Sequence, residues 1–190
     1  MDSIINYIFA MLPFMLVVFP PLTVWRVLRN RAHGTNLYHE IALMIFALFM
    51  VGLDSQTLLP RFEFGAQGLT LQQDGLDGIN LIPFHILEET YIEVTKNGNT
   101  EYFIINFLGN IAVFIPIGFL LPLLWNIKGG RVLLTGAVCS LLIELCQLFL
   151  PRSSDVDDLI LNTLGTLLGW LVYKLFSIPF KKFFARFKIS

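Results

Sequence analysis

The residues best able to do chemistry in this chain are polar side chains embedded in apolar sequence. They are carboxamides, carboxylates and one guanidinium: Asn106, Asn110, Glu144, Gln147, Arg152, Asp155, Asp158 and Asn162. A guanidinium can bind a phosphate or a carboxylate through two parallel hydrogen bonds. A carboxylate that is shielded from water can act as a general base. Glu144 and Arg152 are therefore the catalytic candidates, and a purely structural ion pair between them is the competing interpretation.

The spacing of these residues directs them to a common region. Five residues recur at intervals of three and four, which is one stripe of a helix: Asp155, Asp158, Asn162, Gly165 and Gly169. Ser140, Glu144 and Gln147 share one face of the preceding apolar run in the same way. Gly165 and Gly169 form a GxxxG pattern, which lets a neighbouring helix approach closely. The stripe is therefore predicted to face protein.

The composition is typical of a membrane protein. The chain has 190 residues, of which 55% are hydrophobic and 14% are charged, and its mean hydropathy is +0.70. A water-soluble domain of this length would carry many more charged residues on its surface. The formal net charge of −1 gives no reason to expect a nucleic-acid partner. Cys139 and Cys146 are seven residues apart in one apolar run, too far apart on a helix for a disulfide.

Five apolar runs can cross a bilayer, which requires about 20 residues of helix. The predicted spans are residues 4–25, 41–59, 103–125, 132–150 and 159–176. We therefore predict an all-α integral membrane protein, a single domain over residues 1–190 built as a bundle of about five transmembrane helices.

Two of the segments outside the predicted spans carry a pattern of their own. Segment 60–102 contains a strand–turn–strand pattern with Gly65 and Gly68 at the turn, which predicts a small β-hairpin. An interfacial helix or a loop follows around Pro83. In the tail, residues 178–190, phenylalanines recur at helical spacing among basic residues, which predicts an amphipathic helix suited to an anionic inner leaflet. Ser154 and Asp157 match a capping-box pattern at the start of the last span.

The basic residues predict the orientation. If the N-terminus lies outside the cell, only Arg61, Lys96 and Arg152 of the thirteen basic residues fall on the outer side. This is the distribution that the positive-inside rule describes. We therefore expect a multi-pass protein of the cell membrane with an extracytoplasmic N-terminus and a cytoplasmic C-terminus. Segment 60–102 and the turn at 151–158 are then extracytoplasmic.

At a rise of ~1.5 Å per helical residue, the polar side chains form two layers in the outer half of the membrane. Asn106, Gln147 and Asn162 lie about 4–5 Å below the outer boundary, and Asn110 and Glu144 about 9–10 Å below it. Carboxamides in membrane helices often serve only as hydrogen bonds between helices, which is the structural alternative for these layers. Glu144 differs because an ionisable residue at this depth costs roughly 2.5–3.5 kcal/mol to insert and by default marks a functional site.

Three stretches of the second half of the chain resemble the VanZ-like membrane family: NLIPF at 80–84, NFLGNIAVFIPIGFLLP at 106–122 and IELCQLFLPRSSDVDDLILNTLGTLLGW at 143–170. The first two spans are similar to the family only in hydropathy. The positions that carry the motif are Asn80, Pro83, Asn110, Pro116, Gly118, Glu144, Gln147, Arg152, Asp155, Asp158, Asn162 and Gly165. The resemblance implies a bacterial multi-pass membrane protein that lowers susceptibility to teicoplanin-type lipoglycopeptides. It assigns no catalytic residue.

Three functions are compatible with these residues. In the first, a polar pocket in the outer leaflet binds or remodels an envelope lipid or a lipoglycopeptide, and Arg152 meets a phosphate or carboxylate of the ligand. In the second, an integral membrane enzyme modifies a lipid-linked envelope substrate, with Glu144 as general base and Arg152 stabilising developing charge. The third is lipid flipping or transport, which the apolar sequence below Glu144 disfavours.

Neither a cofactor nor a metal is expected. Asp155 and Asp158 lack a clustered third ligand for a cation. The three histidines are scattered along the chain and form no nucleophile–base constellation: His33, His39 and His85. The expected partners are membrane lipids and either a lipoglycopeptide antibiotic or a lipid-linked envelope precursor, with no nucleic acid. The sequence assigns no oligomeric state.

Overall fold

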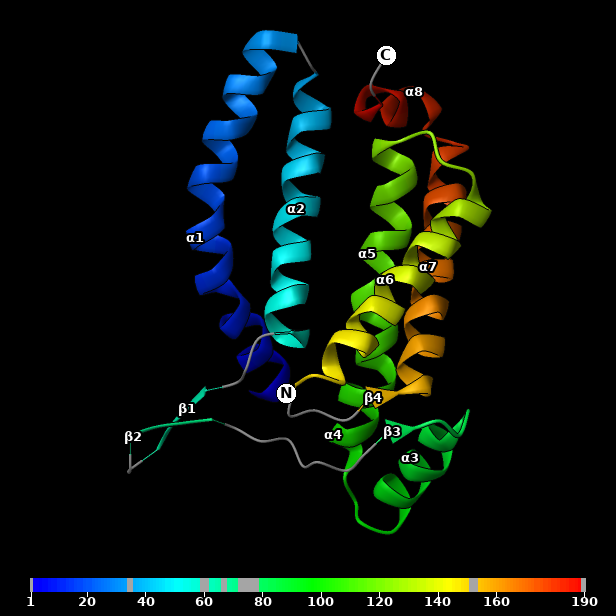
Figure 1. The fold of residues 1–190 in the computed structure, drawn as a ribbon. Coiled ribbons are helices and arrows are strands. Elements are labelled where there is room, and N and C mark those ends of the chain that lie inside the picture. The colour runs from blue at the N-terminus through cyan, green and yellow to red at the C-terminus, as the bar shows by residue number, and fades with distance from the viewer. Residues whose placement is uncertain are drawn as a thin grey trace.

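Five long helices dominate the computed structural model, which describes residues 2–33, 36–58, 62–65, 68–71, 79–150 and 154–188 (Figure 1). They are α1 (Asp2–His33), α2 (Leu37–Thr57), α5 (Gly109–Leu124), α6 (Gly129–Gln147) and α7 (Val156–Ser177). The third span also includes α4 (Thr100–Tyr102) and the π-helix η1 (Phe103–Leu108), which lead into α5. Five helical segments are long and apolar enough to cross a membrane. The predicted all-α membrane bundle is confirmed.

The observed spans differ from the predicted ones at their ends. They cover Phe9–Arg29, Leu37–Thr57, Thr100–Leu124, Gly129–Gln147 and Val156–Ser177. The fourth helix ends at Gln147 rather than near Leu150, because the chain tightens into turns in which Leu150 N donates to Gln147 O (2.9 Å). A following proline disfavours helical backbone at the residue before it, so the helix stops short of Pro151. The last helix starts three residues earlier than predicted, so Asp158 lies within its first turn.

Helices α5 and α7 form the most closely packed pair. A Cβ built on Gly165 would lie 2.1 Å from Ile111 O, and one built on Gly118 would lie 2.0 Å from Thr166 O. A Cβ on Gly169 would likewise lie 2.1 Å from Ile115 O. These distances are far below any van der Waals contact, so the backbones approach one another only because glycines stand at these positions. The predicted GxxxG stripe on α7 therefore faces α5.

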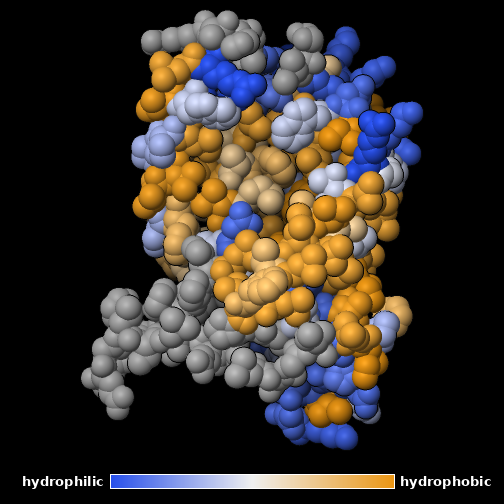
Figure 2. Space-filling model, in the orientation of Figure 1, coloured by the Kyte–Doolittle hydropathy of each residue, from blue (hydrophilic) through white to orange (hydrophobic). Residues whose placement is uncertain are grey.

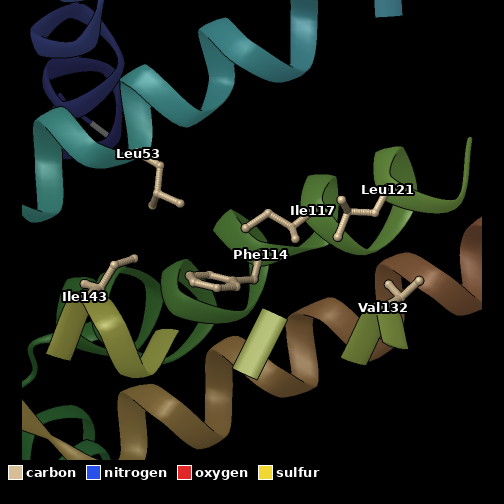
Figure 3. Packing of buried hydrophobic residues seen from close by; sticks show 6 residues of the cluster. All are labelled: Leu53, Phe114, Ile117, Leu121, Val132 and Ile143. Atoms are coloured by element: carbon tan, nitrogen blue, oxygen red, sulfur yellow. The ribbon is translucent and has the colours of Figure 1, made fainter. Parts of the chain in front are cut away.

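Helices α1 and α2 form a second unit beside this bundle (Figure 1). No residue of the Phe9–Arg29 span is buried, so α1 packs at the edge of the molecule, against α2. Arg26 and Glu40 join the two helices through paired hydrogen bonds, Nε to Oε2 at 2.8 Å and Nη2 to Oε1 at 2.5 Å. The two units meet in a buried apolar cluster from α2, α5 and α6 (Figure 3): Leu53, Phe114, Ile117, Leu121, Val132 and Ile143.

Small elements gather at one end of the bundle, which we call the α3 end. β1 (Phe62–Gly65) and β2 (Gly68–Leu71) pair antiparallel with Glu63 opposite Thr70, as the sequence predicts for a hairpin. β3 (Ile79–Asn80) pairs parallel with β4 (Ser154–Asp155). α3 (His85–Thr95) lies beyond the ends of α5, α6 and α7 (Figure 1). The start of the last span is thus tied to a segment 75 residues earlier in the chain.

The opposite end, the α8 end, is closed by the C-terminal tail. The predicted amphipathic helix is present as two short helices, α8 (Lys181–Phe184) and η2 (Ala185–Phe187). Phe184 is buried in a cluster with Leu123 and Leu124 from α5, and so it contacts protein. Buried His39 Nδ1 lies 2.8 Å from Phe187 O, a further contact between the tail and α2. The tail therefore packs across the helix ends, with Phe180 and Phe183 exposed.

Candidate functional site

The predicted site residues meet where α6 ends and α7 begins, at the α3 end. Glu144 lies in the last turn of α6, and 7% of its surface is exposed. Its Oε2 accepts hydrogen bonds from Ser154 Oγ and from Asp155 N, both at 2.9 Å. The carboxylate therefore holds the connection between the two helices. Arg152, with which Glu144 would form the structural ion pair of the alternative interpretation, lies outside the described residues.

Asp155 links the start of α7 to β3. Its Oδ1 accepts a hydrogen bond from Asp157 N at 2.8 Å, and its Oδ2 accepts one from Asn80 Nδ2 at 3.1 Å. Asp155 is therefore the N-cap of α7, and the predicted capping box of Ser154 with Asp157 is wrong. The Ser154 hydroxyl donates to Glu144, and the N-cap position of α7 is occupied by Asp155.

Asp157 holds the start of α3, a role that its predicted place in a capping box did not indicate. Its side chain is 1% exposed, and it accepts hydrogen bonds from Phe84 N (2.5 Å) and Ile86 N (2.8 Å). These amides belong to the first turn of α3, whose donors have no partner within the helix. Phe84 itself has a left-handed backbone with a φ of 65°. The only sequence signal for this role is a third aspartate in the run from Asp155 to Asp158.

Asp158 and Asn162 connect α7 to its two neighbours. Asn110 Nδ2 of α5 donates a short hydrogen bond to Asp158 Oδ1. Asn162 Nδ2 donates to Ser140 Oγ of α6 at 2.9 Å, and both residues are buried. Asn162 Oδ1 is buried and has no hydrogen-bond partner among the residues that the structure describes. The stripe predicted from spacing thus faces α5 and α6 with its polar groups as well as its glycines.

Gln147, Asn106 and Asn162 bind different partners. Gln147 Nε2 donates to Thr57 O at the end of α2 (3.2 Å), whereas Asn106 Nδ2 donates to Tyr102 O within its own span (3.2 Å). The predicted layer concerned depth in the membrane, and it stays a prediction. The π-helix η1 contains Asn106 and has more residues per turn, so it changes the direction of this side chain.

A second polar cluster connects α3 to the start of the third span. Tyr102 OH donates to Glu89 Oε2 at 2.6 Å, and His85 Nδ1 lies 3.2 Å from Glu89 Oε1. The sequence did not predict a contact between His85 and Glu89. An interval of four residues brings two side chains together only on a helix, and the structure shows that α3 is one. Within the described ranges, no group of three or more His, Cys, Asp or Glu side chains could hold a metal ion.

The arrangement combines a buried frame with partly exposed polar groups. Glu144, Asp157 and Asn162 are buried and bonded to protein, so they fix the relative positions of α3, α6 and α7. Asn110 and Asp158 are half-buried. Phe149, two residues after Gln147 in the chain, is 90% exposed. Polar groups and an exposed apolar side chain in one stretch of the chain can together meet an amphipathic ligand.

A family model described as VanZ/LLP1 matches residues 4–177 of the chain, nearly its whole length and including every described residue of the polar network. Neither the curated proteins nor the solved structures contain a match.

Proposed function

The chain belongs to the VanZ/LLP1 family, and from this premise we propose that it binds or remodels an envelope lipid or a lipoglycopeptide. In this proposal the polar site at the α3 end lies in the outer leaflet of a bacterial cell membrane. Its activity contributes to resistance to teicoplanin-type glycopeptides.

The orientation rests on the charge distribution. The α8 end carries basic residues on the turn before α6, on the end of α7 and on the tail: Lys128, Arg131, Lys174, Lys181, Lys182, Arg186 and Lys188. The positive-inside rule favours a cytoplasmic location for such an end. We therefore propose that the α3 end faces the outside, with the N-terminus extracytoplasmic and the C-terminus cytoplasmic.

One observation carries the proposal: the stretch of the family motif that contains Glu144 is hydrogen-bonded to both of the other stretches. Glu144 accepts from Asp155 N, and Asp155 in turn accepts from Asn80, which begins the NLIPF segment. Asp158, in the same stretch, accepts from Asn110 of the second stretch. An ionisable residue inside a membrane helix is costly to insert into the bilayer. The presence of Glu144 at this position therefore favours a functional role over generic packing.

The proposed ligand contacts follow from exposure. Glu144 and Asn162 are buried and serve as the frame, whereas the half-buried Asn110, Asp155 and Asp158 can meet a head group. Arg152 stands two positions before Ser154 in the sequence, and its guanidinium would bind a phosphate or carboxylate of the ligand. Apolar side chains beside this site would contact the acyl chains.

A susceptibility assay with matched variants tests this function. The protein and the variants Glu144→Gln and Arg152→Ala are expressed in a teicoplanin-susceptible Gram-positive host, and the minimum inhibitory concentration of teicoplanin is measured. Each variant should lose the protection that the unchanged protein gives, at equal abundance in the membrane by immunoblot. Lys96→Gln, which removes an exposed charge just after α3, is the control and should protect fully. Full protection by both site variants, or none by the unchanged protein, would refute the proposal.

An enzymatic role is the second candidate, and one distance favours it. Ser154 Oγ donates to Glu144 Oε2 at 2.9 Å, the geometry in which a carboxylate acts as general base on a hydroxyl. Mass spectrometry of envelope lipids from cells with and without the protein discriminates the two functions. A lipid species that appears or disappears with the protein, and whose change is lost in Glu144→Gln, favours an enzyme. Lipid flipping has no such support, because Phe114, Ile117 and Leu121 make the core of the described bundle apolar.

A further inference from the structure

We propose that residues 81–84 and one face of α3 form a lipid-contacting surface that inserts among the acyl chains of the leaflet at the α3 end. The buried polar network at the start of α7 holds this surface in place. The inference does not depend on the proposed function, because a chain with no effect on glycopeptide susceptibility would still present the same surface to the bilayer.

The surface consists of large apolar side chains that the fold leaves uncovered. Leu81 is 74% exposed, Ile82 65% and Phe84 61%. Leu87 and Tyr91 continue it along α3 with exposures of 52% and 65%. Phe84, Leu87 and Tyr91 follow one another at intervals of three and four residues, so they line one face of the helix.

The opposite face of α3 is directed to protein. Ile86 is buried. Glu89 accepts from Tyr102 OH, and Glu93 accepts from the side chains of Asn97 and Asn99. The Glu89 and Glu93 carboxylates are thus used within the fold. The exposed apolar face is what remains for another partner, and amphipathic helices of this kind lie in the interface of a bilayer.

Hydrogen bonds of the buried polar network hold the backbone that carries these side chains. Asn80 Oδ1 accepts from Ile82 N at 3.0 Å while its amide donates to Asp155. Phe84 is the one non-glycine residue of the described chain with a positive φ, an unfavourable conformation for its type. The two backbone hydrogen bonds to Asp157 hold Phe84 in this conformation. The anchoring residues therefore fix the direction in which this segment points.

The level of this surface indicates lipid as its partner. Asp157 is the second residue of the Val156–Ser177 span, and Asn80 pairs with Asp155 directly before that span. The segment is thus bonded to the protein at the level where the last span begins. In Figure 1 the chain between β3 and α3 lies beside the end of α7. Figure 2 shows hydrophobic side chains continuing from the helices toward this region. In this proposal the hydrocarbon begins where the last span begins, so acyl chains reach this segment.

Glu88 limits the depth of insertion. It is exposed and lies at the edge of the apolar face, four residues from Phe84. A carboxylate is favoured among head groups rather than among acyl chains, so α3 should lie at the boundary between them.

Spin labels on the full chain test this inference. Single cysteines are placed at Ile82 and Leu87 in a Cys139→Ala/Cys146→Ala background, labelled with a nitroxide and reconstituted into vesicles of phosphatidylcholine and phosphatidylglycerol. Collision rates are measured with oxygen, which concentrates in the bilayer, and with an aqueous nickel chelate. Leu142, 55% exposed on α6, is the lipid-facing control, and Lys96 at the end of α3 is the aqueous control.

The labels at Ile82 and Leu87 should collide with oxygen several-fold more often than with nickel, as the label at Leu142 does. Nickel collision as frequent as at Lys96 would place the surface in water and overturn the inference. Protection from both reagents would mean that protein covers the surface, which overturns it equally. A label at Tyr91 replaces either position if a variant fails to elute as a single species from a sizing column. The collision measurement uses no antibiotic. A result that overturns this inference can therefore be distinguished from a negative result in the susceptibility assay.

Discussion

At the scale of residues, each carboxylate near the start of α7 binds a different neighbouring element. Glu144 holds the connection from α6, Asp155 caps α7, Asp157 holds α3 and Asp158 binds α5. Each carboxylate accepts from protein donors, and such charge-assisted hydrogen bonds are stronger than neutral ones. A single substitution in this run should therefore disturb one neighbour and spare the others.

Asp157→Asn should loosen α3 without unfolding the bundle. The amide that replaces one carboxylate oxygen cannot accept from Phe84 N or Ile86 N, and a buried donor without a partner costs about 1–3 kcal/mol. Amide hydrogen exchange in a peptide covering residues 84–88 should therefore become roughly 5- to 150-fold faster. Mass spectrometry of the detergent-solubilised protein measures this.

Asp158→Asn is the matched control for Asp157→Asn. Asp158 contacts Asn110 on α5 rather than the backbone of α3, and an asparagine there keeps an acceptor oxygen. The exchange of residues 84–88 should stay unchanged in this variant. Equal acceleration in both variants would mean that general loosening, and not the bonds to Phe84 and Ile86, explains the effect.

At the scale of elements, the contact between α5 and α7 depends on the absence of side chains. Gly165→Ala should destabilise the protein, because the added methyl group would lie 2.1 Å from Ile111 O and force the helices apart. Overpacking of this kind typically costs about 1–3 kcal/mol. Thermal unfolding of the purified protein in detergent, followed by the loss of its monodisperse peak, should show a lower midpoint.

Gly130→Ala is the control at the same scale. A Cβ at Gly130 would meet nothing within 4 Å, although the residue also lies in a helix, at the start of α6. Its unfolding midpoint should equal or slightly exceed that of the unchanged protein, since alanine favours helix more than glycine does. A Gly165→Ala variant as stable as Gly130→Ala would contradict the close approach of α5 and α7.

At the scale of the whole molecule, the two ends differ in charge and in the elements that cover them. The proposed orientation predicts that a cysteine at Lys96 reacts with a membrane-impermeant maleimide in intact cells. A cysteine at Lys182, exposed on α8, should react only after the membrane is permeabilised. The reverse pattern would invert the orientation and place the polar network on the cytoplasmic side. Both variants need the Cys139→Ala/Cys146→Ala background.

The sequence by itself determined the membrane class, the five spans, the hairpin and the stripe of Asn162, Gly165 and Gly169 on α7. These features depend on local properties, because hydropathy and intervals of three and four residues are set within a single helix. Family membership also followed from sequence, because the motif is read in order along the chain. Arg152 remains a prediction, since it lies outside the described residues.

Only the tertiary structure decided which polar groups bind one another. The bond from Asn80 to Asp155 and those from Asp157 to the start of α3 join segments more than 70 residues apart. The same structure placed Asn106 in a π-helix, where it bonds to Tyr102 O, and buried Phe184 against α5. Periodicity predicts the face of a helix on which a side chain lies. The partner on that face depends on how separate segments pack, and local spacing does not determine that packing.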